Sequence, residues 1–315
     1  MAMKKILLVF TFGIFFSLNL YSQDLQIFNL SQQEFSSNNS ILYISLSDIY
    51  RISSNPDSSA LPLDLLGNDR DTVYPIITLD SNFRALFLAC TGLSERHNVY
   101  LHDAIQSKTQ IIPIHKLKSV AVLSIYYGDY YGSVETYDYQ IGFEINPKFV
   151  ENKMGSFTFI AFGKENPFAE KPLSPLIWEA ISPNSDPILQ AYLSSDSLIK
   201  TSFTNTHRFE IHNLSYYLAD IENHMASARK LCVYDQISKN WIFDHNFLEG
   251  ESASHTPIIT SPDTEPNNVY QWTGDFFKNQ PTMIFGMQYQ SFGCPSFFTL
   301  EKNEKEIALN CDNRH

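Results

Sequence analysis

The chain has 315 residues, of which 43% are hydrophobic and 14% are aromatic, and its formal net charge is −12. This hydrophobic content is enough to build a folded core and argues against a disordered chain. The negative charge repels nucleic acid and anionic lipid, and no cluster of Lys and Arg offsets it locally, so we expect no nucleic-acid partner.

The first 22 residues have the layout of a secretory signal peptide. Lys4 and Lys5 form a short basic region, residues 6–16 are almost entirely apolar, and polar residues follow as far as Ser22, after which we place the cleavage site. The apolar run is too short to span a bilayer, and an uncleaved membrane anchor is the alternative interpretation. The short, lysine-led signal is typical of bacterial export. We therefore predict a periplasmic or extracellular mature chain with no membrane span.

The mature chain is long enough for one large β domain or two smaller ones. Cleavage after Ser22 leaves about 293 residues with 20 basic and 34 acidic side chains, because Lys4 and Lys5 are lost. Aromatic residues, Ser, Thr and Asn are abundant, whereas helix-forming runs of Ala, Glu and Lys are scarce, which favours β structure. We predict an all-β fold of antiparallel meanders in two similar β-rich halves, tandem β-sandwich-like in arrangement. A single β-propeller-like domain is the alternative.

Residues 83–114 and residues 216–245 share a pattern that suggests the two halves. Each begins with a strand, which a polar connection joins to a second strand that ends in aspartate. A Ser-Lys turn and a third, apolar strand follow. The matching residues, about 132 positions apart and with a one-residue gap, are Asp103, Ser107 and Lys108 against Asp235, Ser238 and Lys239. Because any two meanders share such turn chemistry, unrelated meanders are the alternative. The apolar spacing of residues 214–225 also fits an amphipathic helix.

Residues 119–145 predict two adjacent strands joined by a tyrosine-rich loop. Residues 119–127 are apolar on both faces, and the segment after the loop alternates apolar and polar residues, as a strand with one buried face does. The residues predicted on that buried face are Tyr137, Tyr139, Ile141, Phe143 and Ile145. Tyr130 and Tyr131, in the loop at residues 128–132, are left as candidate ligand contacts.

A proline-rich crossing at residues 163–187 separates the two predicted halves. It contains five prolines, which cannot donate to a strand ladder, so we predict a linker or an irregular surface crossing there. The halves are residues 23–162 and residues 188–315, and the second half is predicted to end in a hairpin.

Tryptophans near proline-rich loops are further candidates for ligand contact. Trp178 lies in the crossing, and Trp272 follows a second loop of this kind at residues 261–268. We expect both indoles to be exposed and able to stack on sugars. Trp241 begins an apolar strand, and we expect it in the core.

The four cysteines fit an oxidising compartment. Cys294 and Cys311 flank an apolar strand, a charged turn and a second apolar strand, so we predict a hairpin closed by a disulfide. Cys90 and Cys232 either pair with each other or remain buried thiols. With no CxxC motif and no close Cys/His spacing, we expect no metal site.

Known catalytic motifs give little indication of an enzymatic activity. The sequence holds no phosphate-binding loop, dinucleotide fingerprint, nucleophile elbow or zinc-protease motif. Residues 197–200, SLIK, match the SxxK of serine acyl-transfer enzymes but lack its partner motifs. The acidic loops at residues 67–72 and 261–268 do not keep the ordered spacing of a calcium loop. We expect no metal and no cofactor.

These features favour a non-enzymatic binding or scaffold protein that acts on an extracytoplasmic protein or glycan of unknown identity. Its candidate contacts are Tyr130, Tyr131, Trp178 and Trp272. The alternative is a β-rich glycan-active hydrolase, which needs two carboxylates about 5 to 9 Å apart in one pocket. A purely structural envelope component is the third hypothesis and requires neither an aromatic surface nor paired carboxylates.

Overall fold

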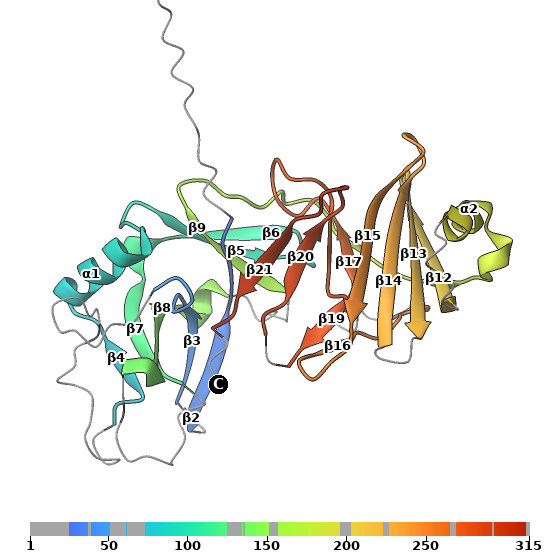
Figure 1. Ribbon diagram of the computed structural model, residues 1–315. Helices are drawn as coiled ribbons and strands as arrows, with labels where there is room; N and C mark the ends of the chain where they lie inside the picture. The colour runs from blue at the N-terminus through green and yellow to red at the C-terminus, as the bar shows by residue number, and fades with distance from the viewer. Residues whose placement is uncertain are drawn as a thin grey trace, which may run out of the picture.

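The computed structural model, shown in Figure 1, describes residues 25–36, 39–50, 61, 73–124, 134, 136–150, 157–195, 203–222, 227–264, 269–291 and 293–312. The predicted signal peptide lies outside the described residues, as do Tyr130 and Tyr131. Within them the chain forms 21 β-strands and two α-helices, and the strand pairing is antiparallel except between β1 and β21. The all-β class is confirmed.

The largest sheet has nine strands and runs through the middle of the molecule (Figure 1), in the order β10-β17-β18-β20-β21-β1-β9-β5-β6. Its strands are β10 (Ser174–Pro175), β17 (Trp272–Gly274), β18 (Met283–Phe285), β20 (Ser296–Thr299), β21 (Glu306–Asn310), β1 (Ile27–Asn29), β9 (Thr158–Gly163), β5 (Asn98–Asp103) and β6 (Lys108–Pro113). Strands from both sides of the proline-rich crossing therefore share one sheet. The division into two halves stays a prediction.

A curled five-stranded sheet lies beside the β5 and β9 end of the large sheet (Figure 1), in the order β2-β3-β8-β7-β4. Its elements are β2 (Ser31–Ser36), β3 (Asn39–Ser45), β8 (Tyr139–Glu144), β7 (Lys118–Leu123), β4 (Ile76–Thr78) and the adjoining helix α1 (Ser81–Thr91). The two sheets enclose one buried cluster, to which the large sheet contributes Leu101 and Ile160 and the curled sheet contributes Ile141 and Phe143.

A second five-stranded sheet forms the other end of the molecule (Figure 1), in the order β11-β12-β13-β14-β15. The elements here are β11 (Glu179–Ala180), α2 (Pro187–Ser195), β12 (Phe203–Ile211), β13 (Leu214–Glu222), β14 (Ser227–Asp235) and β15 (Asn240–Leu248). The remaining elements are β16 (Ala253–His255), β19 (Gln288–Gln290) and the 3-10 helices Ile114–Lys116, Thr136–Asp138, Pro147–Phe149 and Pro183–Ser185.

The expected first strand of the 83–114 meander is wrong, because this segment is helix α1. Asp80 caps the helix: its carboxylate accepts hydrogen bonds from the backbone N–H groups of Asn82 and Phe83. Gly92 ends it in the left-handed conformation, with φ at 69°. The helix buries Phe87 against Tyr50, with ring centroids 5.7 Å apart, so both capping and packing favour a helix.

The meander predicted at residues 216–245 is confirmed, and the helical alternative for residues 214–225 is wrong where the chain is described. β13 pairs with β12 on one side and β14 on the other, which uses its backbone groups in two ladders. Its alternate residues Tyr216 and Leu218 are both fully buried in the core of this sheet.

The two aspartate turns match without the one-residue gap that the sequence comparison introduced. Asp103 pairs with Lys108 across one hairpin, and Asp235 pairs with Asn240 across the other. The residue before each second strand has a positive φ, 54° at Ser107 and 57° at Lys239. Turn geometry thus aligns Ser107 with Lys239, whereas residue identity had aligned it with Ser238.

The strand predicted from the tyrosine-rich segment is confirmed from Tyr139 onward. Tyr139, Ile141, Phe143 and Ile145 are fully buried. Tyr137 is 58% exposed, and the expectation that it is core is wrong, because residues Thr136–Asp138 form a 3-10 helix that turns its ring outward. Sheet pairing starts only at Tyr139, which lies opposite Leu123.

The C-terminal hairpin is confirmed as β20 and β21, which pair antiparallel around a turn at Lys302 and Asn303. It brings Cys294 and Cys311 to disulfide distance, with their Cα atoms 5.7 Å apart. Cys90 is exposed and Cys232 is buried, and both are free thiols.

Candidate functional site

The two tryptophans expected at the surface lie in the core. Trp178 is 1% exposed and donates from Nε1 to the side-chain oxygen of Gln271 over 2.6 Å. Trp272 is 7% exposed and donates to the carbonyl of Val269 over 2.9 Å. The expectation of exposure is wrong because β10, within the proline-rich crossing, pairs with β17, so the crossing forms a sheet edge. In this structure neither indole offers a face for stacking.

Trp241, expected in the core, is instead half-buried among three tyrosines on the outer face of the β12–β15 sheet. Its ring centroid lies 4.6 Å from that of Tyr192 on α2, 5.6 Å from that of Tyr217 and 5.1 Å from that of Tyr234. Val233 and Phe243 lie opposite each other on the buried inner face of the sheet. The β-bulge between this pair and the next, Tyr234 and Trp241, shifts the register by one residue and so places Trp241 on the outer face, toward α2.

Polar groups beneath α2 bind the helix to this sheet. Asp186 accepts from the backbone N–H groups of Ile188 and Leu189, from the hydroxyl of Tyr217 and from the guanidinium of Arg208. These contacts use both carboxylate oxygens. The arrangement fixes α2 in place and leaves Asp186 no free acceptor for catalysis.

A second group of contacts beneath α2 surrounds the buried thiol Cys232. Asp244 accepts from the hydroxyl of Tyr192 and from the ammonium of Lys230, each over 2.5 Å. Burial is the main cause that raises the pKa of the Cys232 thiol to about 12. A thiol that stays protonated at neutral pH is a poor nucleophile, so this cluster is structural in character.

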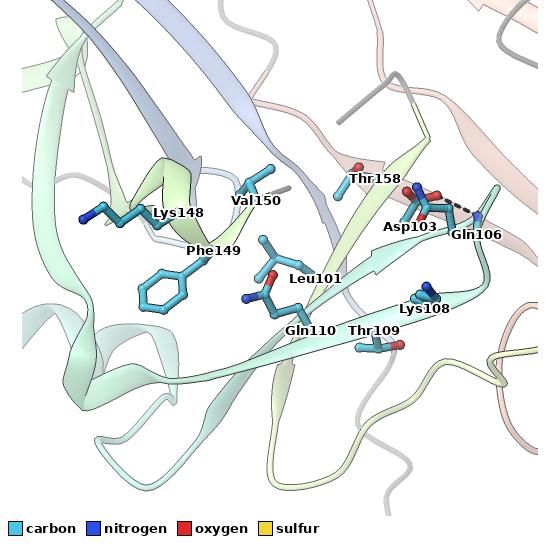
Figure 2. Close-up of a pocket in the computed structure, with 10 residues that line it drawn as sticks. All are labelled: Leu101, Asp103, Gln106, Lys108, Thr109, Gln110, Lys148, Phe149, Val150 and Thr158. Atoms are coloured by element: carbon cyan, nitrogen blue, oxygen red, sulfur yellow. Dashed lines mark hydrogen bonds between the residues drawn. The ribbon is translucent and has the colours of Figure 1, made fainter. Parts of the chain in front are cut away.

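A groove lies beside the buried cluster that the large and curled sheets enclose, between the β5–β6 hairpin and the 3-10 helix Pro147–Phe149 (Figure 2). Its volume is about 340 Å³. The residues that line it are Leu101, Asp103, Gln106, Lys108, Thr109, Gln110, Lys148, Phe149, Val150 and Thr158.

One face of the large sheet forms the floor of this groove. Leu101 pairs with Gln110, and Asp103 pairs with Lys108 on one side and Thr158 on the other, so these side chains project from the same face. Three adjacent strands therefore hold the polar groups of the floor on rigid backbone.

The opposite wall comes from the 3-10 helix. Asn146 starts this helix by accepting a hydrogen bond from the backbone N–H of Lys148 over 2.9 Å. Phe149 and Val150 follow; both are half-buried and pack against the buried cluster that the large and curled sheets enclose. Packing against the core fixes the position of this apolar wall relative to the sheet.

Among the described residues, the groove has two cations at opposite ends and one carboxylate that already accepts a hydrogen bond. Figure 2 shows Lys148 at the end formed by the 3-10 helix and Lys108 at the end formed by the hairpin. Both are exposed, and neither has an ion-pair partner among the residues that the structure describes. Asp103 accepts from the backbone N–H of Gln106 over 2.9 Å, as the dashed line in Figure 2 shows.

A larger cavity of about 970 Å³ lies between the start of β1, the end of α1 and the end of β9. Phe28, Leu93 and Phe162 supply apolar walls, and Glu165 contributes a carboxylate. His97 also lines it, and the buried Nδ1 atom of His97 has no hydrogen-bond partner in the described part of the chain.

The fold defines a β-rich protein with a groove that presents both polar and apolar groups on a sheet face. No protein-family model, curated protein or solved structure matches the chain. Among the described residues, no helix is both long and apolar enough to cross a membrane.

Sequence reasoning had recognised part of this groove only as turn chemistry. Asp103 and Lys108 were noted for the hairpin that they close. Lys148 follows the turn signal Asn146-Pro147, which indicates a turn and no binding role. Because β-strand pairing brings Lys108 and Lys148 to one groove, no local pattern could link them.

Proposed function

We propose that this protein is an exported, non-enzymatic binding protein and that the groove between the β5–β6 hairpin and the 3-10 helix Pro147–Phe149 is its ligand site. The observation that carries the proposal is the composition of the groove. Amide, hydroxyl and ammonium groups lie beside an apolar wall on a rigid sheet face, which is the combination that orients a ligand. The predicted signal peptide and the disulfide-distance cysteines are consistent with export.

Binding is favoured over glycan hydrolysis because, among the residues that the structure describes, Asp103 is the single carboxylate that lines the groove. Hydrolysis of a glycoside by the usual route needs an acid and a second carboxylate that acts as base or nucleophile. Glu165 is likewise the single carboxylate that lines the larger cavity in the described part of the chain. The hydrolase therefore remains the second hypothesis.

Glycan-array binding of the mature chain, residues 23–315, tests the proposal. Export predicts that the secreted product has lost residues 1–22, which intact mass measures. We expect at least one glycan to bind and the groove variant Gln110→Ala to weaken it roughly two- to tenfold, the effect of losing one or two hydrogen bonds. The matched control Asn303→Ala, in the turn of the C-terminal hairpin, should bind as the unmodified chain does.

Two results would redirect the proposal. If no glycan binds, or if Gln110→Ala binds like the control, the groove is not a glycan site. Release of new reducing ends from a bound glycan would favour the hydrolase. The double variant Tyr130→Ala/Tyr131→Ala tests in the same assay whether the tyrosine-rich loop contributes to binding.

A further inference from the structure

We infer that the ligand of this groove is an acidic glycan, a chain of uronate sugars whose carboxylates meet Lys108 and Lys148. This inference rests on the proposed function and adds the chemical class of the ligand. Three features of the groove support this inference: the position of its two lysines, the chemistry of its polar groups, and the fact that its floor is a face of the sheet.

The two ammonium groups are available to a ligand, although the chain as a whole is acidic. Two other lysines are already paired with carboxylates: Lys118 with Glu144 over 3.3 Å, and Lys171 with Asp275 over 2.7 Å. Lys108 and Lys148 have no such partner in the described ranges and flank the groove at its two ends. A ligand that carries negative charges at intervals along its length can pair with both lysines, whereas a single small anion pairs with only one of them.

The polar groups of the groove suit sugar hydroxyls. Gln106, Gln110 and Thr158 offer amide and hydroxyl groups that both donate and accept hydrogen bonds. Phe149 adds a half-buried aromatic ring on the facing wall, beside Val150. An aromatic ring packs well against the C–H face of a pyranose, so hydrogen bonding and apolar contact occur in the same groove.

The floor of the groove favours a glycan over an acidic peptide. An extended peptide commonly binds by adding a strand to a sheet edge, where backbone N–H and C=O groups are unpaired. Here the floor is a sheet face across β6, β5 and β9, and β5 pairs with a strand on each side. A ligand lying on this face meets side chains, whereas the sheet edge that a peptide could extend is the outer side of β6.

Titration calorimetry with uronate hexamers of galacturonate, guluronate and mannuronate tests the inference on the mature chain. We expect at least one of the three to bind, and its fully methyl-esterified form, which keeps the sugar backbone and loses the charge, to bind at least tenfold more weakly. Lys108→Gln and Lys148→Gln should each lower the affinity about three- to tenfold, since each removes one charged hydrogen bond. Lys302→Gln, an exposed lysine in the C-terminal hairpin turn, is the matched control and should change the affinity by less than about twofold.

The outcomes separate this inference from the proposed function. If esterified and free hexamers bind equally, and Gln110→Ala weakens both while the lysine variants do not, the groove is a glycan site but the acidic class is wrong. Failure of all three hexamers to bind overturns the acidic class, and failure of every glycan overturns the proposed function too. Lysine-dependent binding of a poly-glutamate peptide in place of the uronates would assign the groove to an acidic polypeptide. Unchanged near-UV circular dichroism shows that each variant is folded.

Discussion

His102 is a buried histidine whose surroundings disfavour its charged form. It is 1% exposed, its ring stacks on Phe168 with centroids 4.6 Å apart, and its Nδ1 lies 3.0 Å from the hydroxyl of Thr109. Desolvation by burial lowers the pKa of His102 to about 4, against the ordinary value of 6.5. The folded chain therefore holds this ring neutral over a range of pH in which the unfolded chain protonates it.

The first prediction is that the free energy of unfolding falls as the pH drops from 6.5 to about 4. The unfolded chain binds a proton below its pKa of 6.5, whereas the folded chain binds one only near pH 4, so acid favours unfolding. The difference between the two pKa values corresponds to about 3 kcal/mol at the lower end of this window. Urea unfolding at half-unit steps between pH 7 and pH 4 measures it.

The variant His102→Phe should flatten this pH dependence above about pH 4.5. Below that value the lowered pKa values of Glu95, Asp220 and Asp275 add their own loss of stability, so the upper part of the window reports His102. The exposed histidine variant His115→Gln is the control and should keep the full slope. An unchanged slope in His102→Phe would assign the effect to other groups.

Sequence reasoning at this scale was right where a residue lies inside a paired strand and wrong at strand ends. Tyr139 and Tyr137 occupy equivalent places in the alternating pattern, yet one is fully buried and the other is 58% exposed. The difference arises because pairing with β7 begins at Tyr139, and the start of a ladder depends on the partner strand. Trp178 and Trp272 were expected at the surface because they lie near proline-rich loops, yet both are buried, since β10 within the proline-rich crossing pairs with β17.

The C-terminal hairpin is the element for which sequence and structure agree most closely. β20 and β21 leave the cysteines at 294 and 311 across the open end of the hairpin, where a bond closes a loop with a sequence separation of 17. Such a loop lowers the entropy of the unfolded chain and stabilises the folded one by roughly 3 kcal/mol.

The second prediction follows for the double variant Cys294→Ser/Cys311→Ser. It should lose roughly 3 kcal/mol of unfolding free energy relative to the oxidised chain and become insensitive to reductant. Thermal unfolding with and without dithiothreitol measures both effects. The control Cys90→Ser removes an exposed thiol and should keep the stability and the reductant response of the unmodified chain. A reductant response in the double variant would place a disulfide elsewhere.

Helix α2 depends on Asp186, which caps its N-terminus and binds the sheet beneath it. The third prediction is that Asp186→Ala costs about 2 to 3 kcal/mol, since it removes a helix cap and leaves Tyr217 and Arg208 without this acceptor. Asp186→Asn keeps a capping oxygen and should cost less. Urea unfolding gives the totals, and amide exchange of residues in α2 shows whether the helix itself is loosened.

The control for the α2 prediction is Asp263→Ala. This aspartate is exposed, and its side chain makes no contact with α2 in the described structure, so the variant should be neutral to within about 0.5 kcal/mol. If Asp186→Ala is as mild as Asp263→Ala, or if Asp186→Asn costs as much as Asp186→Ala, the cap has no separate role.

Elements were predicted from period and turn chemistry, and the one misassigned element shows the limit of that approach. The apolar residues of 83–91 are compatible with strand or helix, and only the Asp80 cap and Gly92 end identify the helix. The groove is harder still to predict from the sequence. Its floor depends on β5 pairing with β6 and β9, and the start of β9 lies 55 residues after the end of β5.

At the scale of the whole molecule, strands from the two predicted halves are interleaved. β1 lies between β9, from the first half, and β21, from the second. The amide of Asn310 donates to the carbonyl of Ile27 over 3.0 Å, and the backbone N–H of Asp312 donates to Asp48 over 2.8 Å. The C-terminal strand is therefore bound to the start of the described chain.

The core crosses the same boundary. Phe159 of β9 packs against Phe276 and Phe297, both from the second half, with ring centroids 5.1 Å apart in each pair. These rings belong to one buried cluster that also contains Ile27 and Tyr100. Removing either half would expose large aromatic side chains, each of which contributes about 2 to 3 kcal/mol by its burial.

The fourth prediction is that the mature chain unfolds in a single cooperative step and that residues 23–162 do not fold alone. Without β21, strand β1 loses one of its two neighbours, and without Phe276 and Phe297 the ring of Phe159 faces solvent. Calorimetry should give equal calorimetric and van't Hoff enthalpies for the mature chain. The fragment should show no cooperative transition and should bind a hydrophobic dye. Two resolved transitions, together with a folded 23–162 fragment, would instead establish that the halves are independent domains divided at residues 163–187.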